Sequence, residues 1–115
     1  MAPEAATYLW DALKAARLVM QFVQGRSFDD YGGDAMLRSA VERQLEIVGE
    51  ALNQLRKLDP ETAGTIPELA QAVGLRNILI HGYASVNNRL VWDVASGHLP
   101  QLAVRLEQRL ANTPP

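Results

Sequence analysis

Residues 34–58 read DAMLRSAVERQLEIVGEALNQLRKL, and this stretch decides the fold. Its apolar residues recur at steps of four, four, three, four and three, at Leu37, Val41, Leu45, Val48, Leu52 and Leu55. That spacing puts them on one face of a helix, and so long a stripe is typical of a helix packed almost parallel to a neighbour. Asp34 is a suitable N-cap, and Asp59 followed by Pro60 ends the segment. The sequence therefore predicts one long central helix.

A second amphipathic helix is predicted before it, over residues 3–24, with Gly25 as its stop. The apolar face of this first helix consists of Leu9, Ala12, Leu13, Ala16, Val19, Met20 and Val23. The intervening stretch 25–33, GRSFDDYGG, is interpreted as a loop with Phe28 and Tyr31 as aromatic anchors.

After the central helix the pattern predicts a turn at 62–67 and a third helix from Pro67 to about His81. This helix is apolar on more than one side, so we expect much of it to be buried; the residues concerned are Leu69, Val73, Leu75, Ile78, Leu79 and Ile80. A short fourth helix is expected over 91–96, broken around Gly97 and Pro100. A fifth follows, with Leu99, Leu102, Leu106 and Leu110 on one face. The prediction is an all-α bundle of four to five helices in a single domain, 1–115.

The composition excludes several classes of protein. The chain has 115 residues, of which 48% are hydrophobic, so a packed core is expected rather than disorder. There is no cysteine, which excludes a disulfide scaffold, a zinc finger and thiol catalysis. No apolar run reaches the ~20 residues of a membrane span, and the first residues lack the basic start of a secretion signal. A cytoplasmic protein without a membrane partner is expected.

The net charge of −2 argues against a simple nucleic-acid binder, but the charge is unevenly distributed. Residues 1–75 hold seven basic and eleven acidic side chains, a balance of −4. Residues 76–115 hold four basic and two acidic ones, a balance of +2. Both histidines, His81 and His98, lie in this more basic part.

The stretch most suggestive of chemistry is residues 76–83, RNILIHGY. Histidine exchanges protons near neutral pH, and arginine offers a fixed cation that matches phosphate oxygens. Together they fit cleavage of an RNA phosphodiester without a metal: the ribose 2′-OH attacks, His81 moves a proton, and Arg76 stabilises the developing charge. Asn77 is expected to orient His81 or contact phosphate. At ~100° per residue, Arg76 and His81 lie about 140° apart on the helix, so the reach of the arginine must bring them to one substrate.

One chain offers only one such histidine, whereas in-line cleavage works best with a base and an acid on opposite sides of the phosphorus. Two chains related by a two-fold axis supply two copies of His81, so the mechanism favours a homodimer with a composite site. His98 is the rival second histidine, but it has no polar companion nearby in the sequence.

Structural interpretations remain open beside this one. His81 can be a hydrogen-bonded structural residue, Arg76 can pair with a carboxylate of the central helix, and Tyr83 can be a packed aromatic. Glu42, Glu46 and Glu50 form an i, i+4, i+8 ridge. It is either a solvated face or, through Glu50, a means of orienting Arg76 or part of a partner surface. No tight spacing of ligands predicts a metal site, and no cofactor is expected.

The segment GLRNILIHGY, residues 74–83, resembles the Arg-x4-6-His motif of the HEPN superfamily, in the Arg-x4-His-x-Tyr form of HepT-like toxins. The resemblance extends to Gly49-Glu50-Ala51 on the central helix and to the stretch 84–102 after the motif. Residues Leu69-Ala70 depart from it, because members often carry a tryptophan in that stretch.

This resemblance implies a homodimeric HEPN-type bundle that acts as a toxin ribonuclease of a type VII toxin–antitoxin pair, with tRNA as one substrate class. By position it implies Arg76, His81 and Asn77 as the catalytic set. It also implies Tyr83 as the residue to which an MNT-type nucleotidyltransferase antitoxin transfers AMP. The alternatives are a non-catalytic helical partner subunit that binds a nucleotidyltransferase or a nucleotide, and a purely structural helical dimer.

Overall fold

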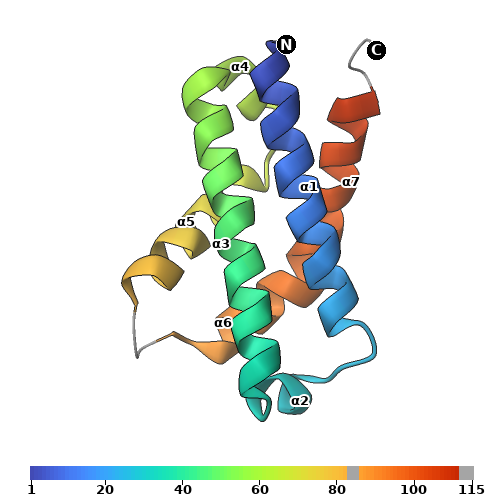
Figure 1. Cartoon of the computed structure of the whole chain (residues 1–115), viewed down its shortest axis with the longest axis vertical. Helices are drawn as coiled ribbons and strands as arrows, with labels where there is room; N and C mark the ends of the chain where they lie inside the picture. Colours follow the sequence, from blue (N-terminus) through green and yellow to red (C-terminus); the bar gives the residue numbers. More distant parts are fainter. Residues whose placement is uncertain (83–85, 112–115) are drawn as a thin grey trace.

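The predicted central helix is α3, Ala35–Leu58, and it runs along the length of the molecule in the computed structural model, which describes residues 1–82 and 86–111 (Figure 1). The Asp34 carboxylate accepts a hydrogen bond from the Leu37 amide at 3.0 Å, which confirms the predicted N-cap. All six residues of the predicted stripe are buried. The apolar stripe from which the fold was predicted therefore forms the central part of the hydrophobic core.

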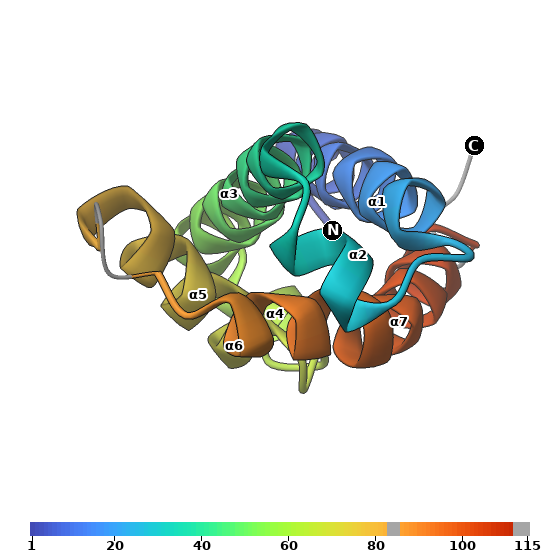
Figure 2. The ribbon, with the colours of Figure 1, turned by 90° about the horizontal axis from the view of Figure 1, so that it is seen from below.

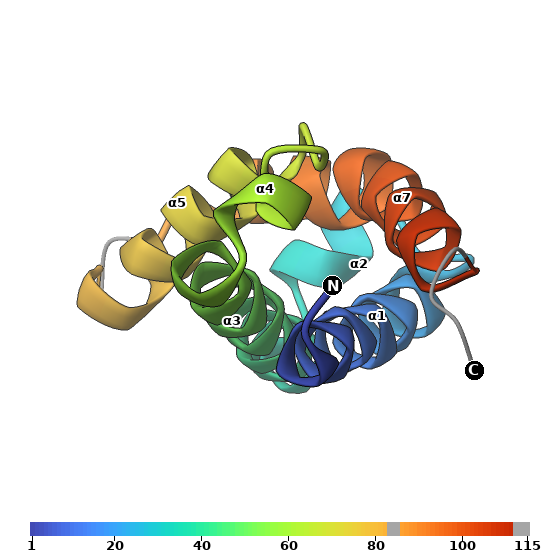
Figure 3. The same ribbon diagram turned by 90° about the horizontal axis from the view of Figure 1, so that it is seen from above.

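Three further helices are arranged around α3. α1, Pro3–Val23, runs antiparallel to it and confirms the first predicted helix to within one residue. α5, Leu69–His81, packs on the other side of α3, and α7, Leu99–Ala111, packs against α1. The end views show the resulting order α5, α3, α1, α7 (Figures 2 and 3). The all-α bundle is confirmed, with α3 in contact with both α1 and α5.

The stretch predicted to be a loop at 25–33 contains a short helix, α2, Phe28–Gly32. Its start is a capping box that the sequence interpretation missed. The Ser27 hydroxyl accepts from the Asp30 amide at 3.1 Å, and the Asp30 carboxylate accepts from the Ser27 amide at 2.9 Å. Gly25, at φ +74°, ends α1 as predicted and turns the chain toward this helix.

α2 closes the lower end of the bundle as drawn in Figure 1, and Tyr31 anchors it there. The Tyr31 ring is fully buried, with its centroid 5.6 Å from that of Trp92. Burial raises the pKa of the Tyr31 hydroxyl above its ordinary value. Phe28 is the second anchor, because the Arg89 guanidinium lies 3.9 Å from the centre of its ring. Both aromatic anchors are confirmed.

The region after α3 is more helical than predicted. The turn expected at 62–67 overlaps a short helix, α4, Pro60–Ala63. Asp59 caps it by accepting from the Thr62 amide at 3.0 Å, so the residue that ends α3 also begins α4. α5 begins at Leu69 rather than at Pro67.

The predicted break near Gly97 and Pro100 is wrong. α6, Asn88–Asp93, continues through a π-helical segment, Val94–His98, directly into α7. A proline in an α-helix clashes with the carbonyl four residues earlier and lacks an amide hydrogen to bond it. The wider π turn immediately before Pro100 accommodates this mismatch, so the chain stays helical where the sequence suggested a stop.

The core is apolar throughout the described ranges 1–82 and 86–111, with no polar or charged residue in the buried class. Its largest fully buried aliphatic side chains are Leu9, Leu13, Leu52, Leu55, Leu99, Leu102 and Leu106. In the same ranges, none of the helices combines the length and the hydrophobicity that crossing a membrane requires.

Candidate functional site

The site is built where α5 crosses α3, and Gly49 makes that crossing close. A Cβ atom placed on Gly49 would lie 2.2 Å from the Arg76 Cβ and 2.8 Å from the Ala72 carbonyl oxygen. Both distances are far below van der Waals contact, so only glycine fits here. The first carbon atoms of the Arg76 side chain therefore lie directly against the backbone of α3. Sequence interpretation missed this role, although Gly49 stands beside the apolar stripe and belongs to the Gly49-Glu50-Ala51 step noted above.

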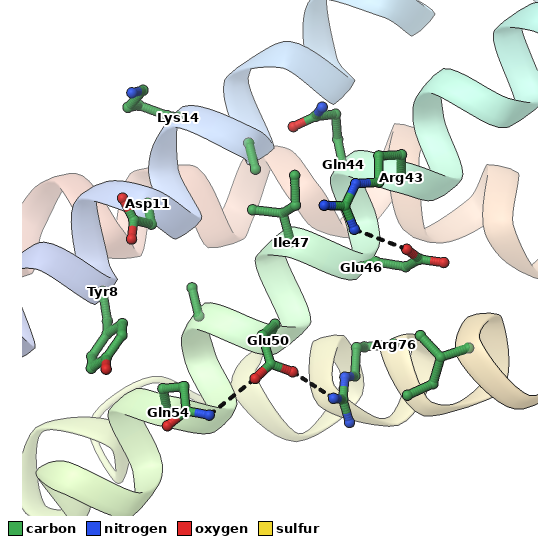
Figure 4. A pocket seen from close by; sticks show the side chains of 13 residues that line it. Tyr8, Asp11, Lys14, Arg43, Gln44, Glu46, Ile47, Glu50, Gln54 and Arg76 are labelled. Carbon is green, nitrogen blue, oxygen red and sulfur yellow. Dashed lines mark hydrogen bonds and ion pairs between the residues drawn. The ribbon is translucent and has the colours of Figure 1, made fainter.

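From this crossing, the Arg76 guanidinium reaches two acceptors. Its Nη2 donates to Glu50 Oε2 at 2.5 Å, and its Nη1 donates to Asn77 Oδ1 at 2.8 Å. Gln54 Nε2 donates to the other oxygen of Glu50 at 3.0 Å (Figure 4). The structure thus brings the predicted pair Arg76 and Asn77 together, and it adds Glu50 and Gln54 from α3.

The predicted carboxylate ridge divides into three different environments. Glu42 is partly buried, and burial raises the pKa of its carboxyl group. Glu46 pairs with Arg43 at 3.3 Å on the same helix. Glu50 pairs with Arg76 across two helices, and the hydrogen bond from Gln54 together with the Arg76 charge lowers its pKa. The contact between Glu50 and Arg76 that one of the sequence interpretations expected is therefore observed.

An open groove of about 550 Å³ lies beside this network, between α1, α3 and α5. It is lined by Tyr8, Asp11, Lys14, Ala15, Arg43, Gln44, Glu46, Ile47, Glu50, Ala51, Gln54, Arg76 and Ile80 (Figure 4). Three cationic side chains and three carboxylates line it, so its charges cancel. The charge of one chain's groove therefore does not by itself attract a polyanion such as RNA.

His81 is the last residue of α5, and its side chain is exposed. No hydrogen bond or ion pair joins it to any residue of the described ranges, and it does not line the groove. Gly82 ends the helix as predicted, with its amide donating to the Ile78 carbonyl at 2.6 Å. Arg76 is therefore fixed against α3, whereas His81 projects from the end of the same helix. Tyr83, the fourth predicted site residue, lies outside the described residues.

The expectation that α5 is largely buried holds for Leu69, Val73, Leu75 and Leu79 only. Ile78 is 44% exposed and Ile80 is partly exposed, both between Arg76 and His81 in the sequence. Among the described helices, α5 packs mainly against α3, and its first turns also lie beside the π-helical segment and α7. An apolar surface therefore remains beside the predicted site.

His98 is far from His81 on the same chain. It lies in the π-helical segment beside Gln71 and Ala72, near the first turn of α5, while His81 ends that helix. At 1.5 Å per residue, the nine residues from Ala72 to His81 separate these positions by about 14 Å. His98 and His81 therefore do not share one phosphate within one chain. The described residues also include no group of three His, Asp or Glu side chains placed to hold a metal ion.

The fold and these residues define a class of protein: an all-α bundle of the HEPN type, with Arg76 and His81 spaced as Arg-x4-His on one helix. The family described as "Ribonuclease HepT-like" matches residues 12–109. The chain therefore belongs to the HepT-like ribonuclease family of the HEPN superfamily.

Individual proteins with similar sequences agree with this family assignment. A protein of Caldanaerobacter subterraneus subsp. tengcongensis named "Putative RNase" is 34% identical over 103 residues, covering 90% of this chain and 91% of its own length. A protein of Thermococcus cleftensis named "Probable ribonuclease HepT" is 35% identical over 107 residues, covering 88% and 91%. One of Methanocaldococcus jannaschii, also named "Putative RNase", is 33% identical over 100 residues, covering 87% and 91%. No solved structure gives a significant match.

Proposed function

We propose that this chain is a metal-independent endoribonuclease that cuts RNA, with tRNA as one substrate class, and that Arg76, Asn77 and His81 carry out the reaction. The observation that carries the proposal is the placement of two side chains on the same helix of a HepT-like ribonuclease bundle. Arg76 is anchored, and His81 is exposed and has no hydrogen bond or ion pair with any of the described residues. The arginine is a fixed phosphate ligand and the histidine is accessible to a substrate, which are the two requirements of the reaction.

The reaction follows from these side chains. His81 of one copy removes the proton from a ribose 2′-OH, and the 2′-oxygen attacks the adjacent phosphorus. The bond between phosphorus and the 5′-oxygen breaks, and the 5′-oxygen takes a proton from a second acid. The products are a 2′,3′-cyclic phosphate and a 5′-hydroxyl. Arg76 stabilises the negative charge on the phosphoryl oxygens, and Asn77 holds the arginine.

The second acid is proposed to be His81 of a second copy, so that the active form is a homodimer. Two observations support this. The other histidine of the chain, His98, lies about 14 Å away along α5. The exposed Ile78 beside the site provides apolar surface for an interface.

The family membership further supports a role as the toxin of a type VII toxin–antitoxin pair in the cytoplasm, controlled by an MNT-type nucleotidyltransferase. AMP on Tyr83, two residues after His81, places a phosphate and a bulky nucleotide next to the residues that would bind RNA phosphate. The modification would block the site and repel the substrate.

If AMP transfer to Tyr83 regulates the protein, we expect Tyr83→Phe to retain RNA cleavage but to resist neutralisation by the nucleotidyltransferase. The hydroxyl that accepts AMP is absent, while the ring is kept. Intact mass after co-expression with the partner checks this: the wild type gains one or more AMP increments and the variant gains none. A Tyr83→Phe protein that is still modified and silenced would show that another residue is the acceptor.

The ribonuclease proposal itself is tested by incubating RNA with the purified protein in EDTA, for the wild type and for His81→Ala. Cleavage by the wild type alone supports it. Cleavage by neither protein favours the non-catalytic partner subunit, and equal cleavage by both excludes His81 from the mechanism.

A further inference from the structure

The ion pair between Glu50 and Arg76 links residues far apart in the sequence, as do Arg17–Glu107 and Arg105–Glu68 among the described residues. Arg76 Nη2 and Glu50 Oε2 are 2.5 Å apart; the Arg76 side chain is 24% exposed and the Glu50 side chain 46%. The pair joins two helices and residues 26 apart in the sequence. By contrast, Arg43 and Glu46 pair at 3.3 Å within one helix, with the arginine 68% exposed. An exposed pair of that second kind contributes little to structure.

Both ends of the pair are held by additional partners. Each oxygen of Glu50 accepts one hydrogen bond, from Gln54 on one side and from Arg76 on the other. The two terminal nitrogens of Arg76 are bound to different acceptors, Glu50 and Asn77. Figure 4 shows the bond to Glu50. A planar guanidinium with both terminal nitrogens engaged is unable to rotate freely, although hydrogens on it remain for a phosphate.

Gly49 and Glu50 are consecutive residues of α3 that contact the two parts of the same side chain. Gly49 admits the first carbons of Arg76, and Glu50 binds its guanidinium. We propose that Gly49 and Glu50 form a seat that positions Arg76 for catalysis, with Gln54 fixing Glu50 in turn. This inference rests on the proposed ribonuclease function and adds a positioning residue, Glu50, that does not touch the substrate.

The physical reason is preorganisation. A free arginine side chain has many rotamers, and a transition state gains most from a charge that is already oriented when the reaction begins. The Glu50 carboxylate stays ionised well into the acid range, because the Gln54 hydrogen bond and the Arg76 charge lower its pKa. The seat is therefore intact at the neutral pH at which the histidine chemistry operates.

The test compares Glu50→Ala and Glu50→Gln with a matched control, Glu107→Ala. Glu107 also forms an ion pair between two helices, with Arg17 at 3.3 Å, but on α1 and α7 away from α5. We expect Glu50→Ala to lower kcat for RNA cleavage by about 10- to 100-fold while KM changes much less, because the arginine is misplaced rather than lost. Glu50→Gln keeps an acceptor oxygen and recovers most of the rate. Glu107→Ala cleaves like the wild type.

A second measurement is independent of cleavage. In NMR spectra of ¹⁵N-labelled protein, the Arg76 guanidinium of the wild type is expected to show slowed rotation and protected Nη protons, and Glu50→Ala is expected to lose both. If Arg76 is as ordered in Glu50→Ala as in the wild type, the seat does not exist, whether or not the protein cuts RNA.

The two proposals fail in different ways. If the wild type cuts RNA, His81→Ala does not, and Glu50→Ala cuts at the wild-type rate, the function stands and the positioning role of Glu50 is wrong. A faster Glu50→Ala protein also overturns it, because Glu50 would then restrain Arg76 rather than prepare it. If the wild type does not cut RNA, the ribonuclease function fails and the NMR comparison alone decides the inference.

Discussion

His81→Ala is expected to lower the rate of RNA cleavage in EDTA by at least about 10³-fold without changing the stability of the protein. General acid and base catalysis each contribute roughly 10²- to 10⁴-fold, and a homodimer loses both when its two copies of His81 are replaced. The side chain is exposed and has no hydrogen bond among the described residues, so its removal leaves the core intact. The free energy of unfolding should therefore change by no more than about 0.5 kcal/mol. Initial rates on a labelled RNA, together with thermal unfolding of both proteins, check this.

The matched control is His98→Ala, which removes the only other histidine. His98 is also exposed, but it lies near the first turn of α5, about 14 Å along the helix from His81. We expect it to cleave RNA at the wild-type rate. Loss of activity in His98→Ala with retention in His81→Ala would reverse the assignment. If both variants lost activity equally, His81 and His98 would both be needed as base and acid. A homodimer with two copies of His81 would then no longer be required.

Gly49→Ala is expected to force α3 and α5 apart and to destabilise the protein. The new Cβ would lie 2.2 Å from the Arg76 Cβ and 2.8 Å from the Ala72 carbonyl oxygen, and neither is the far end of a flexible side chain. α3 and α5 must therefore separate, at a cost of about 2–3 kcal/mol in the free energy of unfolding. For a chain of this size, that lowers Tm by about 10 °C. RNA cleavage should fall as well, because α5 carries Arg76 away from Glu50.

Gly74→Ala provides the control for this prediction. Gly74 lies on α5, two residues before Arg76, but a Cβ there meets no atom within 4 Å. Alanine favours a helix over glycine by about 1 kcal/mol, so this variant should be slightly more stable than the wild type and fully active. Chemical denaturation of the two variants measures the difference directly. If Gly49→Ala is as stable and as active as Gly74→Ala, the helices tolerate a wider crossing and the close approach at Gly49 has no functional role.

Most of the fold was predictable because its core is periodic. The stripe from Leu37 to Leu55 is buried as expected, and Asp34 caps α3 as expected. The secondary-structure predictions were wrong where local hydrogen bonds make a segment helical although its amino-acid composition is typical of a loop or a break. Ser27 and Asp30 close a capping box around a stretch that is polar enough to be interpreted as a loop. The π turn before Pro100 keeps the chain helical through two helix breakers, and no single-residue preference indicates such a turn.

The site was only partly predictable. Helix geometry places Arg76 and His81 about 140° apart, and the structure has Arg76 packed on α3 while His81 projects from the end of α5. Their separation on the helix was therefore predictable. The seat at Gly49 and Glu50 was harder to predict, because it depends on which turn of α3 meets α5, and helical periodicity alone does not fix that register. The exposed Ile78 was misjudged because periodicity shows that a helix is apolar but not how many neighbours cover it.

The chemistry of the RNA ends tests the central claim most directly. Wild-type protein is incubated in EDTA with an RNA of known sequence, and the fragments are analysed by mass spectrometry. Attack by the 2′-oxygen predicts a 2′,3′-cyclic phosphate on one fragment, or the 3′-phosphate formed when it opens, and a 5′-hydroxyl on the other. A 2′-deoxy substitution at the cleaved nucleotide should prevent the cut. Fragments with 3′-hydroxyl and 5′-phosphate ends, or cleavage that disappears in EDTA, would contradict the account.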